Sequence, residues 1–209
     1  MGIPVEVPGL NTIIPEIGEG RLVVVESGAD PAKSFFVRRL ALSAMQAHVV
    51  TTFVTSRDRE EVRDQLAREG GRPAWEEGTV EIVEEDSMQD LDIYGGSGGL
   101  LAVDSFSYLT LELSGPELAH LLRRVRNLCR EKHTTVVLAT DRGMYEPRSE
   151  AVTAHLADGV IQFHAKEGPE GLIRYLRIPK WSDGRFIDRN IYYDFDGKRI
   201  AVDLRSRVL

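Results

Sequence analysis

Lys33 and Ser34 are neighbouring residues whose types could bind the phosphates of a nucleotide and its magnesium ion. They close an octapeptide that follows an apolar run and precedes a segment of helical periodicity. The phosphate-binding pattern G-x-x-x-x-G-K-[ST] has a lysine and a hydroxyl residue at this place, between a strand and a helix. Its two glycine positions hold Ser27 and Ala32 in this chain, although Gly28 remains beside the first. The sequence therefore predicts a phosphate loop with part of its chemistry missing.

Asp30 and Pro31 argue against phosphate binding by this loop. Pro31 has no N–H to offer, and Asp30 would repel a phosphate charge at contact distance by about 4 kcal/mol. The same residues have a structural explanation, since Asp30 is a favoured helix N-cap and Pro31 then falls at the first helical position. In that case the carboxylate occupies the free N–H groups and partly neutralises Lys33. Two hypotheses stay open: a self-capped loop, or a weak nucleotide site that includes Gly28, Asp30, Lys33 and Ser34.

Asp104 ends the apolar run Leu100–Val103 and is the second candidate for phosphate chemistry. An acid at the end of such a strand holds the magnesium ion in nucleotide-binding proteins, directly or through water. Ser34 and Asp104 are therefore the expected metal ligands if Mg-ATP or Mg-ADP binds. The histidines lack metal-binding spacing and Cys129 is the only cysteine, so no other metal site is predicted.

Short apolar runs that alternate with segments of helical period must position these residues. Such alternation predicts a mostly parallel sheet with helices on both faces. The expected strands are Leu22–Val25, Val49–Val54, Val80–Val83, Leu100–Val103, Thr135–Ala139 and Gly159–Phe163, and the expected helices are Lys33–Gln46, Arg59–Glu69 and Pro116–Lys132. The polar and apolar alternation of Leu172–Ile178, Arg189–Phe195 and Arg199–Leu204 predicts antiparallel hairpins at the C-terminal end. We expect one α/β domain over residues 1–209.

The net charge, the cysteine count and the length of the apolar stretches argue against several classes of function. The formal net charge of −7 argues against broad electrostatic binding to nucleic acid. A single cysteine allows no intrachain disulfide, and no apolar stretch approaches the roughly 18 residues of a membrane span. We therefore expect a cytoplasmic protein without a membrane span.

Six segments along the chain carry a resemblance to a known family. They are Pro8–Ile14, Glu19–Val25, Leu100–Ser105, Thr135–Thr140, Ala157–Ile161 and Pro179-Lys180. In order and spacing they resemble the RecA superfamily, and within it the KaiC/RadA-like ATPase domains of archaea and bacteria. The resemblance implies a RecA-like P-loop NTPase fold and Leu100–Ser105 as the Walker B strand. It also implies assembly into oligomers, in which Lys180 would reach the nucleotide of a neighbouring subunit.

Two positions outside the loop depart from the family pattern. Arg57 stands where the family has the glutamate that polarises the attacking water, and a guanidinium cannot accept a proton at neutral pH. Asp58 could replace that base, or it could cap the helix that follows. Ser182 stands where the family has an arginine after the hairpin lysine. Lys180 is thus either a finger that acts in the neighbouring subunit or a solvated hairpin residue.

These departures predict a RecA/KaiC-like protein with a degenerate Walker A motif and without efficient ATP hydrolysis. It would act as a structural or regulatory partner, in a homo-oligomer or beside a paralogous RecA-like subunit. One alternative is a slow ATPase that uses Lys33, Ser34 and Asp104, with Asp58 as base. Another is an accessory factor in DNA recombination or repair, because Arg142–Arg148 lies where RecA-like recombinases contact DNA and joins arginine with an aromatic residue.

Overall fold

The computed structural model describes residues 2–28, 30–70, 80–88, 91, 94, 96–169, 171–182, 184 and 187–203, with only the backbone of Asp188. The strands are β1 Ile3–Pro4, β2 Glu16–Ile17, β3 Leu22–Ser27, β4 Thr51–Thr55, β5 Val80–Glu84, β6 Leu100–Asp104, β7 Thr135–Asp141, β8 Gly159–Gly168, β9 Gly171–Lys180, β10 Ile187–Phe195 and β11 Ile200–Asp203. The helices are the 3-10 helix η1 Leu10–Thr12 and the α-helices α1 Ala32–Gln46, α2 Arg59–Glu69, α4 Phe106–Leu109, α5 Gly115–Lys132 and α6 Pro147–Leu156.

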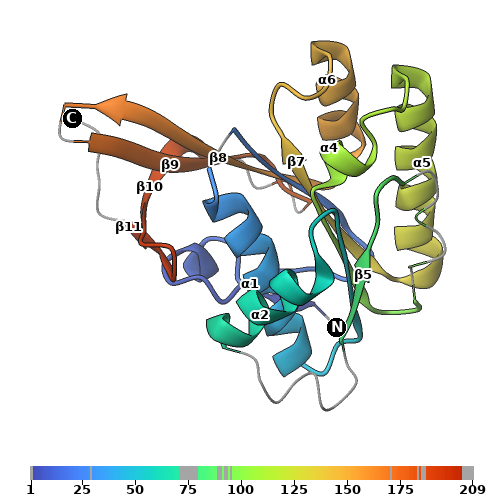
Figure 1. The fold of residues 1–209 in the computed structure, drawn as a ribbon. Coiled ribbons are helices and arrows are strands. Elements are labelled where there is room, and N and C mark those ends of the chain that lie inside the picture. Colours follow the sequence, from blue (N-terminus) through green and yellow to red (C-terminus); the bar gives the residue numbers. More distant parts are fainter. Residues whose placement is uncertain are drawn as a thin grey trace.

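A nine-stranded sheet in the order β11-β10-β9-β8-β3-β7-β6-β4-β5 organises the described part of the chain. The strands from β8 to β5 pair in parallel, whereas β8, β9, β10 and β11 pair as antiparallel neighbours. β8 therefore belongs to both halves, because it is parallel to β3 and antiparallel to β9. The predicted α/β architecture with C-terminal hairpins is confirmed (Figure 1).

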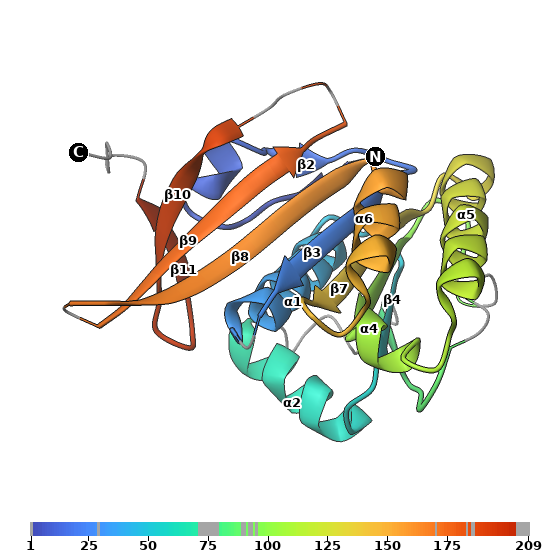
Figure 2. The same ribbon diagram turned by 90° about the horizontal axis from the view of Figure 1, so that it is seen from above.

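Two apolar layers enclose the parallel half of the sheet. Alternate residues of β3 enter different layers: Val23 and Val25 pack with α1, while Leu22 and Val24 pack with α5. The helices α1 and α2 lie on one face and α4, α5 and α6 on the other (Figure 2). Burial on both faces explains why these strands are almost continuously apolar.

The sequence did not predict α4 and α6. α4 is a single turn, and α6 buries only Thr153 and Leu156 among its residues, so its sequence carries little helical periodicity. The predicted strands and helices otherwise form, with ends that shift by a few residues. Leu204, the predicted end of the last strand, lies outside the described residues. That residues 1–209 form one domain stays a prediction.

The segment before η1 contacts the last strand. The backbone N–H of Val202 donates to the carbonyl of Pro8 at 3.1 Å. Gly9 adopts φ +84°, and a Cβ there would lie 2.7 Å from the Val202 carbonyl oxygen. Both the backbone angle and the close approach thus require glycine at this position.

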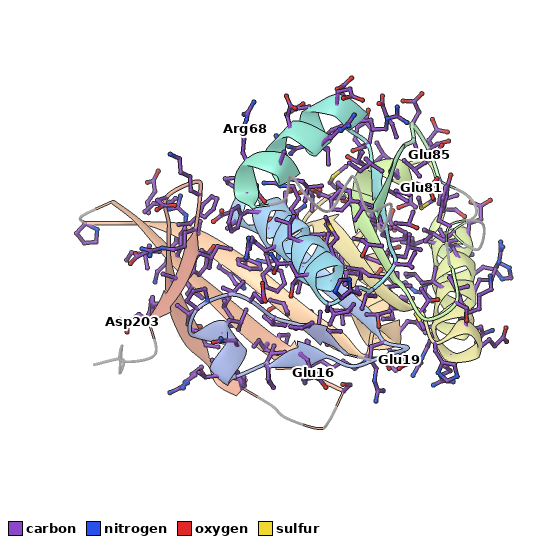
Figure 3. All side chains as sticks on the ribbon, turned by 90° about the horizontal axis from the view of Figure 1, so that it is seen from below. Glu16, Glu19, Arg68, Glu81, Glu85 and Asp203 are labelled. Atoms are coloured by element: carbon purple, nitrogen blue, oxygen red, sulfur yellow. The ribbon has the colours of Figure 1, made fainter. Side chains whose placement is uncertain are left out.

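Several charged side chains point away from the core. Glu16, Arg68, Glu81 and Asp203 project from four different elements or their ends (Figure 3). Among the described residues, no helix is long and apolar enough to cross a membrane.

Candidate phosphate-binding site

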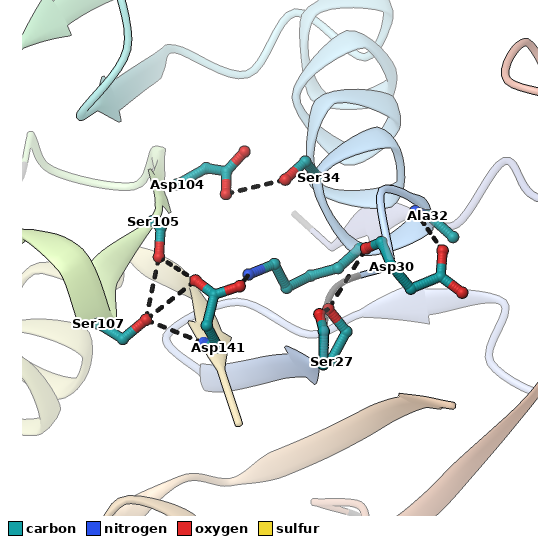
Figure 4. A network of polar contacts seen from close by, with 10 residues as sticks. Ser27, Asp30, Ala32, Ser34, Asp104, Ser105, Ser107 and Asp141 are labelled. Atoms are coloured by element: carbon teal, nitrogen blue, oxygen red, sulfur yellow. Dashed lines mark hydrogen bonds and ion pairs between the residues drawn. The ribbon is translucent and has the colours of Figure 1, made fainter. Parts of the chain in front are cut away.

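Three parallel strands bring the candidate residues to one edge of the sheet. β3, β7 and β6 are consecutive neighbours, and the pairing register places Ser27 opposite Asp141 at the ends of β3 and β7. Asp104 ends β6, and Lys33 and Ser34 lie in the first turn of α1, which follows β3. Carboxyl ends of parallel strands are the usual place for ligand sites in α/β proteins. The edge joins residues from segments that are far apart in sequence (Figure 4).

Ser34 and Asp104, the predicted metal ligands, are in direct contact, and their role in metal binding stays a prediction. Ser34 Oγ donates a hydrogen bond to Asp104 Oδ1 at 3.1 Å, and both residues are buried. A hydroxyl and a carboxylate in contact could each bind Mg²⁺, whose other ligands would be phosphate oxygens and water. Within the described ranges, no group of three His, Cys, Asp or Glu side chains is arranged to hold a metal ion.

Lys33 is bound by a residue that the sequence did not single out. Its Nζ donates to Asp141 Oδ1 at 2.5 Å, and its side chain is only 4% exposed. The expected pairing of Lys33 with Asp30 is therefore wrong. The side chain of Asp141 is 33% exposed, so this ion pair lies at the border between the core and solvent. The ammonium that would bind phosphate already has a carboxylate partner.

The other oxygen of Asp141 accepts two serine hydroxyls. Ser105 Oγ donates to Oδ2 at 2.5 Å and Ser107 Oγ donates to it at 3.1 Å, while the Asp141 N–H donates to Ser107 Oγ at 2.9 Å. Burial alone raises the pKa of Asp141, but the hydrogen bond and charge of Lys33 and the two hydroxyls outweigh it, so the pKa lies below its ordinary value. Asp141 is thus held as a carboxylate.

The loop carboxylate, Asp30, is also fully engaged. Its Oδ1 accepts the Ala32 N–H at 2.9 Å, and its Oδ2 accepts the Tyr193 hydroxyl at 3.1 Å. Arg174 Nε lies 3.5 Å from the same Oδ2, and the Asp30 side chain is 3% exposed. Burial and the neighbouring carboxylate raise the pKa of Tyr193. The carboxylate of Asp30 therefore accepts a hydrogen bond from an N–H group at the start of α1. Residues of β9 and β10 hold this carboxylate in place.

α1 begins at Ala32, one residue before the helix predicted from periodicity (Lys33–Gln46) and one residue after the start that the capping hypothesis implied. Pro31 occupies the N-cap position, with φ −67° and ψ −12°, and Ala32 is the first helical residue. Asp30 was expected at the N-cap and Pro31 at the first helical position. The carbonyl of Gly28 accepts both the Asp30 N–H and the Ser27 hydroxyl. A Cβ on Gly28 would meet no atom within 4 Å, so packing does not require glycine there.

Asp58, the candidate base, caps α2. Its Oδ1 accepts the Glu61 N–H at 2.9 Å, and the Arg59 N–H donates to Glu84 at 2.9 Å. Asp58 and Arg57 are both exposed. This geometry is that of a helix cap, the structural explanation of the Ser56–Asp58 segment. A role for Asp58 as catalytic base stays a prediction.

Lys180, the candidate intersubunit finger, binds its own chain. Its Nζ donates to the carbonyls of His155 at 2.7 Å and Ala154 at 3.3 Å, at the C-terminal end of α6. Burial, and next the charge of Arg126, lower the pKa of Lys180. A cation at this end of a helix is favourable. Action in a neighbouring subunit stays a prediction. Ser182 is exposed, and Arg185, which could replace the missing arginine, lies outside the described residues.

The segment proposed for DNA contact begins with an arginine that is already paired. Arg142 donates to Glu26 Oε1 at 3.2 Å and lies 3.1 Å from His164 Nδ1. The Tyr145 hydroxyl forms a hydrogen bond with Thr110, and Pro147 already belongs to α6. DNA contact by this segment stays a prediction.

Comparison with solved structures identifies the fold as that of RecA-like ATPases. The KaiC-like protein PH0186 of Pyrococcus horikoshii is 19% identical and superposes with a TM-score of 0.77, covering 97% of this chain and 99% of that chain. The flagellar accessory protein FlaH of Methanocaldococcus jannaschii is 17% identical, with a TM-score of 0.78 over 97% of this chain and 98% of that chain. The predicted resemblance in fold is confirmed.

A family model gives the more specific assignment. Residues 17–208 match DUF7125, a family of unknown function, and the chain belongs to that family. The search of curated proteins found no match.

Proposed function

We propose that this protein is a RecA/KaiC-like protein without efficient ATP hydrolysis, which acts as a structural or regulatory partner in an oligomer. One observation carries the proposal: the protein's own carboxylates bind the groups that would bind phosphate. Asp141 neutralises Lys33, and Asp30 accepts an N–H at the start of α1. Arg57, at the position where the family resemblance implies a catalytic glutamate, supports the loss of hydrolysis.

The energetic cost of displacing Asp141 supports weak nucleotide binding. Exposed ion pairs contribute at most about 1 kcal/mol, whereas breaking a fully buried one costs about 3–5 kcal/mol. The pair of Lys33 with Asp141 lies between these limits, because one side chain is buried and the other is one-third exposed. Each 1.4 kcal/mol, roughly, reduces affinity tenfold. Asp141 alone would thus weaken nucleotide binding by about one to two orders of magnitude.

Exposed apolar residues beside the site support the role of a subunit in an assembly. Tyr108 and Leu111 are each 54% exposed, and they lie one and four residues after Ser107 in the chain. Such a surface fits a second copy or a paralogous RecA-like subunit. Light scattering over a range of concentrations tests this. We expect a species larger than the 23.4 kDa chain that Tyr108→Ser with Leu111→Ser reduces to the monomer. A wild-type monomer at all concentrations, also when mixed with candidate paralogues, contradicts assembly.

Calorimetric titration with Mg-ATP tests the loss of nucleotide binding. We expect no saturation up to about millimolar nucleotide, and the same result for Lys33→Met. Saturation of the wild type below about 100 μM, abolished by Lys33→Met, would contradict the proposal. Measuring phosphate release over hours then decides whether any bound ATP is hydrolysed.

The second candidate function is a slow ATPase, and the contact between Ser34 and Asp104 favours it. This pair places a hydroxyl and a carboxylate side by side, and both are oxygen ligands of the kind that a magnesium ion takes. If the chain hydrolyses ATP, Ser34→Ala and Asp104→Asn should each abolish magnesium-dependent turnover. Unchanged turnover in both variants excludes this candidate.

A further inference from the structure

We infer that Lys33, Ser105 and Ser107 form a latent oxyanion site, which the carboxylate of Asp141 fills and from which it excludes phosphate. The inference rests on the proposed function, because it names what keeps phosphate out of the site. The ligand class is a tetrahedral oxyanion, either inorganic phosphate or the terminal phosphate of a nucleotide.

The donor set around Asp141 is the basis of this inference. One ammonium and two hydroxyls converge on a single carboxylate, with Lys33 on one oxygen and both serines on the other. They come from the first turn of α1 and from the start of α4, so they meet only in the folded chain. Figure 4 shows the carboxylate of Asp141 between the two serines on one side and α1 on the other. Converging charged and neutral donors of this kind bind oxyanions strongly.

The burial of the two charged partners shows which one can leave. Lys33 is 4% exposed and fixed in the first turn of α1, whereas Asp141 is 33% exposed at the end of a strand. An anion that arrives from solvent therefore meets Asp141 first, and the donors keep their positions when the carboxylate turns away. Preorganised donors need no rearrangement to accept a new anion.

The carboxylate competes as a tethered ligand. A group on the same chain acts at an effective concentration of about millimolar or more, without any loss of translational freedom on binding. Free phosphate must exceed that concentration, or bind more strongly, to take its place. Removing the charge of Asp141 leaves Lys33 buried without a counter-ion. An external oxyanion can then fill the vacated site and neutralise the charge of Lys33, and both effects favour its binding.

Asp141→Asn tests the inference with inorganic phosphate as the probe. We expect phosphate affinity to rise about tenfold or more above that of the wild type, which corresponds to the roughly 1.4 kcal/mol of a modest ion pair. We also expect phosphate to raise the melting temperature of the variant but not of the wild type. Asp64→Asn on α2 is the matched control, since Asp64 is exposed and lies outside the site. Asp141→Asn with Lys33→Met should lose the gain.

Separate arms with Mg-ATP, adenosine and chloride of equal ionic strength identify the ligand. A gain with phosphate and ATP, but not with adenosine or chloride, places the recognition on the phosphate group. A folded Asp141→Asn variant that gains no affinity for phosphate or ATP overturns the inference and leaves the proposed function standing. Tight ATP binding by the wild type overturns the proposed function and, with it, the exclusion by Asp141.

The inference can also be tested if the Asp141 variant does not fold. Asp141→Asn and Asp141→Ser both leave Lys33 without its counter-ion, so either could be unfolded in plain buffer. The inference then predicts that phosphate restores the native circular dichroism spectrum, because it binds only the folded state. If neither variant refolds in about 100 mM phosphate any more than in chloride of equal ionic strength, the site does not accept an oxyanion.

Discussion

The helices α1 and α2 follow β3 and β4, two strands of the same sheet that β7 and β6 separate, and the first turn of each helix receives an aspartate. Asp30 accepts the Ala32 N–H and Asp58 accepts the Glu61 N–H, both at 2.9 Å. Asp58 is an exposed cap, and Glu84 accepts a second N–H of the same turn, whereas Asp30 is buried and also contacts Tyr193 and Arg174. The same local interaction is thus an ordinary cap in one helix and a junction with the C-terminal hairpins in the other.

Asp30→Ala should give the largest effect of these comparisons. The substitution removes the cap, leaves the Tyr193 hydroxyl without its acceptor and leaves Arg174 without its counter-ion. We expect a loss of about 3 kcal/mol in the free energy of unfolding. Urea denaturation measures it, and Asp30→Asn, which keeps the acceptor oxygen, should lose less. A loss below about 1 kcal/mol for Asp30→Ala would show that Asp30 is a cap like any other.

Tyr193→Phe removes the contact of Asp30 with β10 and leaves the helix cap of Asp30 intact. The ring stays in the core, and only the hydroxyl that donates to Asp30 is removed. A hydrogen bond to a charged acceptor contributes about 1.5–3 kcal/mol, so we expect a loss of about 2 kcal/mol. A double-mutant cycle with Asp30→Ala should show coupling, while a cycle with Asp58→Ala should be additive. Coupling to Asp58 would remove the distinction between the two helix starts.

Asp58→Ala should cost about 1 kcal/mol, as for an exposed N-cap. Asp58→Ser restores a side-chain acceptor and should recover most of the loss. The measurement is again urea denaturation, now with the helical circular dichroism signal as the probe. A loss as large as that of Asp30→Ala would mean that Asp58 holds more than its own helix.

Protonation of His164 should weaken the sheet that holds Asp30, and we expect this effect to be smaller than those of the substitutions above. His164 lies on β8, stacked against Tyr175 of β9, and burial and next Arg142 and Arg177 lower its pKa to about 4 from 6.5. The unfolded chain therefore binds a proton at His164 at a higher pH than the folded chain does. Stability should fall as the pH drops from about 6.5 to about 4 and then level off for this group.

His164→Gln is the control for that pH dependence. Denaturation midpoints at a series of pH values should fall less steeply for the variant than for the wild type between these two limits. Identical slopes for the two proteins would exclude His164 as a source of the acid sensitivity.

The sequence predicted the framework of the site better than its internal pairing. Lys33, Ser34 and Asp104 could be found because a strand, a loop and a helix in order carry a pattern. Asp141 could not, since its contact with Lys33 depends on the sheet order that sets β7 between β3 and β6. Tyr193 and Arg174, which contact Asp30, lie on hairpins that only the folded sheet brings close to the loop.

The prediction of the helices was limited in the same way. Arg59–Glu69 was predicted with its exact ends because Asp58 marks the start and Gly70 follows the end. α6 was missed because its segment has few apolar residues and is defined largely by packing against α5 and β3. Local signals thus set the elements with strong caps, while tertiary contacts set the rest.

The contact of Pro8 with Val202 has a consequence for biosynthesis. Val7 and Leu10 flank Pro8 in the apolar layer that also contains Ile200 of β11, so this layer is completed by residues from both ends of the described chain. A nascent polypeptide leaves the ribosome from its N-terminus, and pairings between distant residues form slowly. The segment around Pro8 therefore cannot form its contact with β11 until β11 has been translated, so this part of the apolar layer closes late.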